Sequence, residues 1–294
     1  MSQNTQVVTA AAAGTVQLGD ITVNRLGYGA MRITGKGVWG PPPDHDAALA
    51  TLRRAVELEV NFIDTADSYG PYVSEELIAE ALAPYPPGLV IATKGGWERV
   101  GPGQWIHNAS PTHLQSAVEG SLKRLRLERI EVYQLHIPDP AVSFDASMET
   151  LARLREQGKI RHVGLSNVTL EHLERARKIV PIVSVQNRYS FADREWDDLL
   201  NHCEQKGIAF IPWAPLGQNR QANELLENAA KRLGATSLQV ALAWLLRRSS
   251  VVLPIPGTSS AAHVPENIQA AALRLPDELF KELSESSFPP ASLR

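Results

Sequence analysis

Cysteine is nearly absent from this sequence, and its scarcity narrows the classes of protein to consider. With Cys203 alone, neither an intramolecular disulfide nor a cysteine-based metal cluster can form. This is typical of a protein of the reducing cytoplasm, and we expect Cys203 to be a small, partly buried residue on a helix. Long apolar runs are missing too, since none reaches the roughly 18 residues that a membrane-spanning helix needs.

The start of the chain lacks the features of a targeting signal. Residues 1–13 are polar and then rich in alanine, without the basic start and long apolar core of a signal peptide. We expect these residues to form a flexible N-terminal tail. The protein is accordingly expected to be cytoplasmic, with no membrane contact.

An excess of either charge is missing as well, since 29 Lys and Arg residues stand against 32 Asp and Glu residues for a net charge of -3. That balance gives no electrostatic reason to expect nucleic acid or an anionic membrane surface as a partner. The hydrophobic fraction of 44% is ordinary for a globular protein with a large core. At 294 residues the chain is long for a single domain but usual for an α/β barrel, which can stand alone as a monomer.

What the chain does have is a regular alternation of strand-like and helix-like segments. A short β-hairpin is predicted first, around Gly19-Asp20. Apolar or β-branched runs that are typical of buried strands then recur eight times, at residues 26–30, 61–65, 89–93, 131–136, 162–165, 183–186, 208–212 and 251–255. Amphipathic patterns predict helices between and after them, at residues 46–58, 74–82, 112–125, 144–156, 170–178, 194–205, 238–247 and 266–273.

Alternating strands and helices predict a parallel sheet, and eight such units favour its closure into a (β/α)8 TIM barrel. The rival arrangement, an open doubly wound sheet, would normally carry a G-x-G-x-x-G turn between a strand and a helix, and the sequence has none there. Residues 95–110 are expected to be a long loop instead. We therefore predict one α/β barrel domain over residues 14–294, with an N-terminal β-hairpin and extra helices, one of them at residues 223–233.

Four protonatable side chains fall at or just after the carboxyl ends of consecutive predicted strands, where barrel enzymes place their active sites. They are Asp64, Tyr69, Lys94 and His136. Taken singly, each has an ordinary structural interpretation, as a turn former, a packed ring, a solvated charge or a structural histidine. Their coincidence at one end of one barrel predicts that they converge on a pocket.

The chemistry open to this group is proton transfer to a carbonyl. Free tyrosine has a pKa of about 10, which is poorly matched to proton transfer at neutral pH. We expect the Lys94 ammonium to lower the pKa of Tyr69, and Asp64 to keep that lysine charged and oriented. Tyr69 would then donate a proton to a carbonyl oxygen while hydride reaches the carbon, and His136 would orient the carbonyl and share its negative charge.

The stretch 62–70, Phe-Ile-Asp-Thr-Ala-Asp-Ser-Tyr-Gly, resembles the second-strand signature of the aldo-keto reductase superfamily. The resemblance extends from about residue 21 to residue 288. It implies a bacterial-type aldo-keto reductase that reduces aldehydes or ketones to alcohols. The family's catalytic tetrad of Asp, Tyr, Lys and His matches Asp64, Tyr69, Lys94 and His136.

The same resemblance implies a nicotinamide cofactor. The positions that would hold it follow the predicted strands, and they are Gly29, Met31, Arg32, Ser166, Asn167, Gln186, Trp213, Pro215, Leu216, Gly217, Gln218, Gly257, Thr258, His263, Glu266 and Asn267. Many members of the family have a lysine in place of Gly257 and an arginine in place of His263, and both pair with a 2′-phosphate. NADPH is the cofactor that the resemblance implies, with NADH as the alternative because these two charges are missing.

Aromatic residues make up only 6% of the chain, yet four of them fall in or near the loops that build the substrate pocket in this fold. We predict that Trp39, Tyr72, Trp97 and Trp105 line the pocket, with packing of the barrel rim as the alternative. A flat aromatic lining favours an aromatic or alicyclic aldehyde as the small-molecule carbonyl substrate.

Two other functions fit a barrel. A catalytically weak, nucleotide-binding regulatory barrel would sense redox state without turnover, but binding alone does not require all four groups of the tetrad. A metal-dependent hydrolase barrel would need an early His-x-His pair, and the eight histidines contain none, so no metal is expected.

Overall fold

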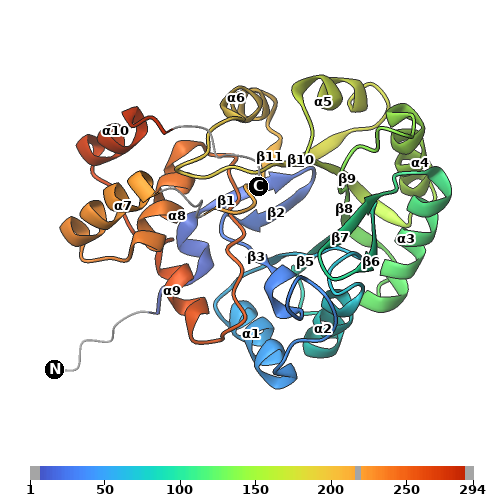
Figure 1. The fold of residues 1–294 in the computed structure, drawn as a ribbon, viewed down its shortest axis with the longest axis horizontal. Helices are drawn as coiled ribbons and strands as arrows, with labels where there is room; N and C mark the ends of the chain where they lie inside the picture. The colour runs from blue at the N-terminus through green and yellow to red at the C-terminus, as the bar shows by residue number, and fades with distance from the viewer. Residues whose placement is uncertain (1–6, 216–219, 289–294) are drawn as a thin grey trace.

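A curled sheet of seven parallel strands forms the centre of the protein (Figure 1). The structure is a computed structural model that describes residues 7–215 and 220–288. In spatial order the strands are β11 (Ala209–Phe210), β10 (Ile182–Gln186), β9 (Ile160–Ser166), β8 (Ile130–Leu135), β5 (Val90–Gly95), β4 (Phe62–Asp64) and β3 (Tyr28–Gly29). Each pairs in parallel with its neighbour, so all the carboxyl ends meet at one end of the sheet.

The eighth predicted strand, residues 251–255, is not a strand, and this part of the barrel prediction is wrong. The segment nevertheless lies between the two edges of the sheet. The Leu253 N–H donates to the Phe210 carbonyl of β11 at 2.8 Å, and the Gly27 N–H, just before β3, donates to the Pro254 carbonyl at 2.9 Å. Because Pro254 and Pro256 have no N–H, they cannot extend these bonds into a ladder. An irregular segment therefore stands where the eighth strand was predicted.

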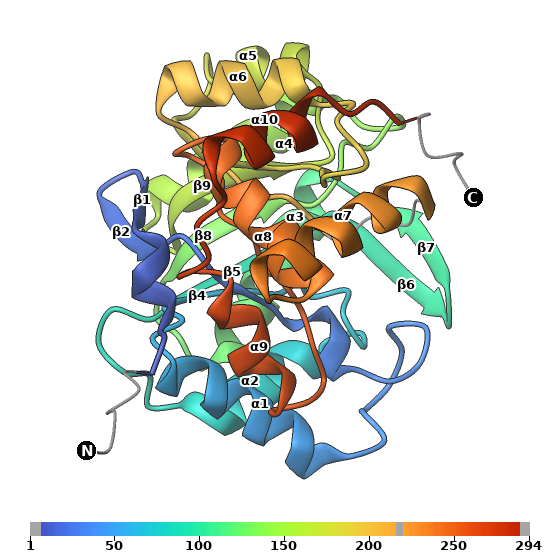
Figure 2. The same ribbon diagram turned by 90° about the vertical axis from the view of Figure 1, so that its left-hand side faces the viewer.

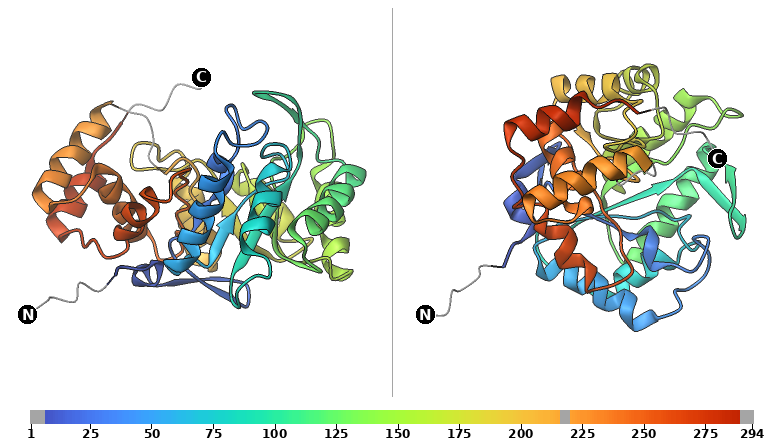
Figure 3. Two further views of the ribbon diagram at one scale, coloured as in Figure 1. Left: turned by 90° about the horizontal axis from the view of Figure 1, so that it is seen from below. Right: turned by 60° about the vertical axis from the view of Figure 1, so that its left-hand side comes forward.

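Helices surround the sheet, as the amphipathic patterns predict (Figure 1). They are α1 (His45–Glu57), α2 (Val73–Leu82), α3 (Pro111–Leu125), α4 (Phe144–Glu156), α5 (Leu170–Ala176), α6 (Asp197–Lys206), α7 (Arg220–Leu233), α8 (Ser237–Arg248), α9 (His263–Gln269) and α10 (Asp277–Glu285). The expected inserted helix is α7. Helix α10 was not predicted, although acidic residues in its first turn mark its start. Figure 3 shows α7 to α10 gathered at one end of the molecule, away from α3 and α4.

Local sequence signals explain several of the helix ends. Ser110 accepts a hydrogen bond from the His113 N–H and is followed by Pro111 at the first helical position of α3. At the other end of a helix, Gly207 closes α6 in the left-handed conformation with a φ of 65°.

Two β-hairpins lie at opposite ends of the molecule (Figure 2). The predicted N-terminal hairpin is β1 (Thr15–Leu18) with β2 (Ile21–Asn24), and its apolar side packs against the inner face of the sheet. The second hairpin, β6 (Trp97–Gly101) with β7 (Gln104–His107), occupies residues that we expected to be a long irregular loop. That expectation is wrong, because residues 97–100 alternate between half-buried and exposed side chains as an edge hairpin requires.

The expected N-terminal tail is ordered at its end. Ala10–Ala13 form a 3-10 helix, η1, in which the Ala10 N–H donates to the Leu58 carbonyl at 2.9 Å. Ala10 is fully buried in the hydrophobic cluster around α1. An alanine-rich composition predicts a loose tail, but small side chains also allow the backbone to approach the barrel closely.

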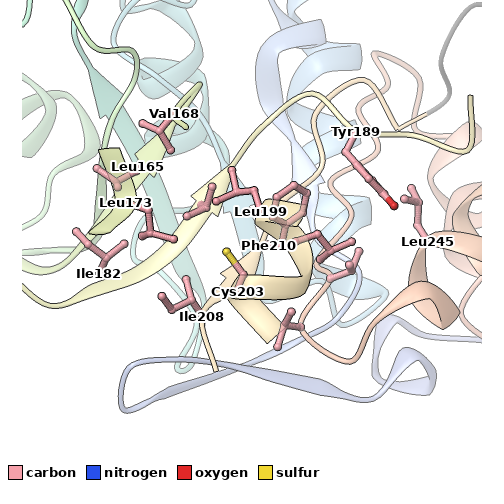
Figure 4. Close-up of a cluster of buried hydrophobic side chains, with 14 of the residues drawn as sticks. Leu165, Val168, Leu173, Ile182, Tyr189, Leu199, Cys203, Ile208, Phe210 and Leu245 are labelled. Carbon is pink, nitrogen blue, oxygen red and sulfur yellow. The ribbon is translucent and has the colours of Figure 1, made fainter. Parts of the chain in front are cut away.

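The apolar core has one part inside the curled sheet and a larger part between the sheet and the helices. Cys203 of α6 lies in the outer part with Leu173, Leu199 and Ile208 (Figure 4). It is fully buried, not partly buried as expected, and burial raises the pKa of its thiol to about 12. The thiol is therefore protonated and inert at neutral pH. Within residues 7–215 and 220–288, no helix has the length and apolarity required to cross a membrane.

Candidate active site

A buried ion pair lies at the carboxyl ends of β4 and β5. Lys94 Nζ is 2.7 Å from Asp64 Oδ2 and also donates to the Thr65 carbonyl at 2.8 Å. The lysine side chain is 0% exposed, so its charge has no contact with water. Lys94 Nζ is 3.4 Å from Tyr69 Oη, which makes the phenol the third neighbour of the ammonium group.

His136 stands on the other side of the tyrosine ring. The two rings meet edge to face, with centroids 5.8 Å apart. Both side chains are largely buried, at 8% exposure for Tyr69 and 7% for His136. The structure thus brings together all four side chains that the sequence analysis singled out, and their catalytic role stays a prediction.

The pKa of Tyr69 differs from the expectation. Burial raises the pKa of Tyr69, and the Lys94 ammonium lowers it by less than burial raises it, so the net shift is upward. The expectation of a net lowering is wrong because it considered the charge of Lys94 but not the loss of water around the phenol. Tyr69 is therefore protonated at neutral pH, the form that a proton donor needs.

The pKa values of Lys94 and His136 move in opposite directions. Burial lowers the pKa of Lys94, but Asp64 and then Tyr69 outweigh it and raise the pKa above its ordinary value, so the ammonium stays charged. Burial, assisted by Lys94, lowers the pKa of His136 well below its ordinary value. His136 is therefore neutral at neutral pH and donates through a single ring N–H. Its Nδ1 lies 3.4 Å from Ser68 Oγ.

Two glutamines hold Asp64 from the side opposite the lysine. The side-chain amides of Gln134 and Gln186 donate to Asp64 Oδ1 at 3.1 Å and 2.8 Å. Gln186 was expected at the cofactor, whereas Gln134 was missed. A polar residue at an inward position of β8, two residues before His136, was the signal that would have found it.

Asn167 and Trp213 form a second group beside the tetrad. Asn167 has a left-handed φ of 56°, unusual for a residue other than glycine, and its amide donates to the His136 carbonyl at 3.0 Å. Trp213 Nε1 in turn donates to Asn167 Oδ1 at 3.1 Å, and Asn167 also bonds Ser166 Oγ at 3.1 Å. The residues expected at the nicotinamide therefore lie next to His136. Pro215 is buried, whereas Leu216, Gly217 and Gln218 lie outside the described residues.

The end of β3 and the segment after residue 256 approach each other closely. A Cβ atom at Gly257 would lie 2.6 Å from the Gly29 carbonyl oxygen, and a Cβ at Gly29 would lie 2.7 Å from the Ile255 carbonyl oxygen. A side chain at either position would therefore require the backbone to shift, which favours glycine at both. The side chain of Arg32 is exposed, and its Cγ lies 3.5 Å from the position that a Cβ atom would take at Gly257.

The other positions expected at the cofactor lie nearby in sequence and differ in exposure. Met31 is half-buried, and the carbonyl of Thr258 accepts a hydrogen bond from the Tyr28 hydroxyl. His263 and Glu266 lie in the first turn of α9, with His263 exposed. Asn267 is buried, and its Oδ1 has no hydrogen-bond partner among the described residues. An orphaned buried acceptor of this kind fits a site for a ligand with an N–H donor.

Three of the four predicted pocket aromatics lie on one side of the tetrad. Trp97 is edge-on to His136, with centroids 6.4 Å apart, and edge-on to Trp105 at 5.8 Å. Trp39 lies with Trp105 around the guanidinium of Arg99. Tyr72 packs elsewhere: its ring covers Arg124 of the outer helix α3 at 4.2 Å. Tyr72 thus contacts α3, and its place in the pocket wall stays a prediction.

Comparison with known proteins places the chain in a family. The aldo/keto reductase family matches residues 25–287, and the chain belongs to this family of NAD(P)H-dependent oxidoreductases. An uncharacterised oxidoreductase of Schizosaccharomyces pombe is 49% identical over 95% of the chain and 91% of its own length. Pyridoxine 4-dehydrogenase of Escherichia coli is 45% identical over 92% of the chain and 98% of its own. An aldo-keto reductase of Klebsiella pneumoniae, solved with NADPH, covers 94% of this chain and 96% of that chain with a TM-score of 0.79 and 26% identity.

Proposed function

We propose that this protein reduces an aldehyde or ketone to an alcohol with NADPH. The observation that carries the proposal is the contact of Tyr69 Oη with Lys94 Nζ at 3.4 Å, with His136 at the edge of the tyrosine ring. In this proposal residues 14–294 act as one barrel domain, in which residues 251–255 complete the wall between β11 and β3. The single cysteine fits a place in the cytoplasm, where we take the protein to work as a monomer.

Each residue of the tetrad has a distinct part in the reaction. Tyr69, protonated because it is buried, gives its proton to the carbonyl oxygen as negative charge develops there. The phenolate that remains is stabilised by the Lys94 ammonium, which Asp64 holds in place at 2.7 Å. His136, neutral at this pH, donates one N–H to the same carbonyl oxygen and so fixes its direction. Gln134 and Gln186 keep Asp64 from rotating away from the lysine.

The residues present fit a nicotinamide dinucleotide. The orphaned Asn267 Oδ1 can accept from an adenine amino group, and the exposed Arg32, whose Cγ lies 3.5 Å from the Cβ position of Gly257, can pair with a phosphate. Ser166, Asn167 and Trp213 would hold the nicotinamide beside His136. When bound, the reduced cofactor supplies hydride to the carbonyl carbon. Arg32 supplies a positive charge where Gly257 cannot, which favours NADPH over NADH.

We propose an aromatic aldehyde as the substrate, with pyridoxal as the first one to test. Trp97 presents an indole next to His136, so a flat ring carrying an aldehyde can stack there while its oxygen faces the tetrad. The similarity to a pyridoxine 4-dehydrogenase supports the same choice, since oxidation of the hydroxymethyl group at position 4 of pyridoxine yields an aldehyde.

The test is the consumption of NADPH with pyridoxal and with 4-nitrobenzaldehyde, followed by absorbance. We expect turnover with both aldehydes, and a fall of about a hundredfold to ten-thousandfold in the variant Tyr69→Phe. Tight NADPH binding without turnover of any aldehyde or ketone would overturn the proposal and favour a regulatory, nucleotide-binding barrel.

A further inference from the structure

Arg99 of β6 joins three segments that are far apart in the sequence. Its guanidinium donates to the carbonyls of Val38 at 2.7 Å, Ser68 at 3.0 Å and Gly37 at 3.0 Å. Its Nε donates to the Gln104 carbonyl across the hairpin at 3.2 Å. The planar fork of five N–H donors makes this set of four bonds available to arginine and not to lysine. The hairpin β6–β7, the loop at residues 37–40 and the peptide just before Tyr69 are thus tied to one group.

The same guanidinium also orders two of the tryptophans near the tetrad. Its central carbon lies 3.7 Å from the ring centroid of Trp105 and 5.5 Å from that of Trp39. Trp105 touches Trp97 edge to face, and Trp97 in turn reaches His136. A continuous row of contacts therefore runs from Arg99 through two indoles to the imidazole.

The loop at residues 37–40 is fastened to the catalytic loop as well. Trp39 and Gly70 form an isolated parallel bridge, and the Gly40 N–H donates to the Gly70 carbonyl. Gly70 directly follows Tyr69, and Ser68 directly precedes it. The wall that carries the indoles and the loop that carries the phenol are consequently held at a fixed separation by contacts on both sides of Tyr69.

We propose that Arg99 is a positioning residue that sets the width of the substrate pocket and so its preference for flat aromatic aldehydes. Its hydrogen bonds go to main-chain carbonyls and its guanidinium lies against two indoles, so it acts through the wall of the pocket. It acts by holding Trp105, and through it Trp97, at a fixed distance from Tyr69 and His136. The inference rests on the proposed function, because it names what selects the substrate at the proposed site.

The experiment compares two aldehydes in three variants. Arg99→Met removes the charge and the fork, Arg99→Lys keeps the charge alone, and Arg155→Met is the matched control. Arg155 also donates its Nε to a main-chain carbonyl, that of Arg161 at 3.1 Å, but on the outside of α4. Specificity is measured as kcat/KM for 4-nitrobenzaldehyde divided by kcat/KM for propanal, with the NADPH dissociation constant from calorimetry and thermal unfolding as checks on folding.

We expect this ratio to fall about tenfold in Arg99→Met, because stacking on a mobile wall is lost for the aryl aldehyde alone. The ratio for Arg99→Lys should lie between those of Arg99→Met and the wild type, and the ratio for Arg155→Met should equal that of the wild type. An equal loss for both aldehydes, or an unchanged ratio, would show that Arg99 only stabilises the fold and would overturn the inference.

A second measurement separates failure of this inference from failure of the proposed function. Calorimetry with 4-nitrobenzyl alcohol on the NADP⁺-saturated protein reports stacking without turnover. We expect about tenfold weaker binding in Arg99→Met than in the wild type. If the wild type turns over neither aldehyde, the proposed function fails and this binding comparison still decides the role of Arg99. Equal affinity of both proteins for 4-nitrobenzyl alcohol, or no binding of this alcohol to the wild type, would overturn the inference on Arg99.

Discussion

Replacing Lys94 by methionine tests the buried ion pair at the centre of the site. Methionine has a similar length and no charge, so the substitution removes the ammonium while filling most of its space. Asp64 then remains buried with only the amides of Gln134 and Gln186 as partners. A buried carboxylate that has lost its counter-charge is costly to keep ionised.

The distance of 2.7 Å between Lys94 Nζ and Asp64 Oδ2 sets the scale of the effect. At an effective dielectric constant of about 20, Coulomb's law gives an attraction of about 6 kcal/mol at that separation. Desolvation of the two charges offsets part of it. Because the substitution leaves one charge without a partner, we expect the free energy of unfolding to fall by about 3–5 kcal/mol.

Urea denaturation of four proteins measures this quantity. Lys159→Met is the matched control, since Lys159 pairs with Glu119 at the same 2.7 Å but at the surface. We expect that control to lose no more than about 1 kcal/mol. The double variant Asp64→Asn with Lys94→Met removes both charges and should regain most of the stability that Lys94→Met loses, without regaining activity.

Two outcomes would refute this reasoning. If Lys94→Met unfolds at the same urea concentration as the wild type, the pair does not stabilise the fold as its burial requires. If the double variant is no more stable than Lys94→Met, the loss comes from packing and not from an unpaired carboxylate. Turnover should fall by orders of magnitude in both variants, because the phenolate of Tyr69 loses its stabilising charge.

Three further predictions concern single residues. Tyr69→Phe should leave the NADPH dissociation constant within about twofold of the wild type while turnover is lost, and a parallel loss of binding would assign the tyrosine a structural role. Burial lowers the pKa of His136 in the folded protein. The unfolded chain therefore binds a proton at this imidazole more readily than the folded protein does, so the free energy of unfolding should decline as pH falls below about 6.5. His136→Gln should lack this part of the decline in unfolding measurements on the cofactor-free protein, and an identical pH dependence would contradict it. Arg32→Ala should weaken NADPH binding about tenfold and NADH binding little, as measured by calorimetry, and equal losses would remove Arg32 from the 2′-phosphate.

Seven of the eight strands could be predicted because each is a short apolar run between helices with clear ends. The eighth run, residues 251–255, has the same composition, but Pro254 and Pro256 remove the donors that a ladder needs. The hairpin β6–β7 was missed because its side chains alternate over few residues, between glycines that are equally common in irregular loops. Composition alone therefore does not distinguish an apolar run that forms a strand from one that does not, nor a hairpin from an irregular loop.

For the site, the sequence was sufficient to find the four titratable residues but not their electrostatic state. The net pKa shift of Tyr69 depends on how much water burial removes, a property of the assembled barrel that no local pattern carries. Gln134 was missed for a related reason, since a glutamine of β8 matters here only because its side chain reaches Asp64, two strands away on β4. Tyr72 shows the converse, because its place in the sequence near the tetrad did not fix the direction of its ring.

The N-terminal hairpin, β1 with β2, covers the amino ends of the strands on the inner side of the curled sheet. Leu18 and Val23 are fully buried at the amino ends of the strands, in contact with the apolar lining inside the sheet. These apolar side chains separate Lys94 and Asp64 from solvent at the amino ends of the strands. In the proposed reaction, the proton that Tyr69 gives up would then be replaced from the carboxyl ends of the strands, the same side by which reactants would enter and the alcohol would depart.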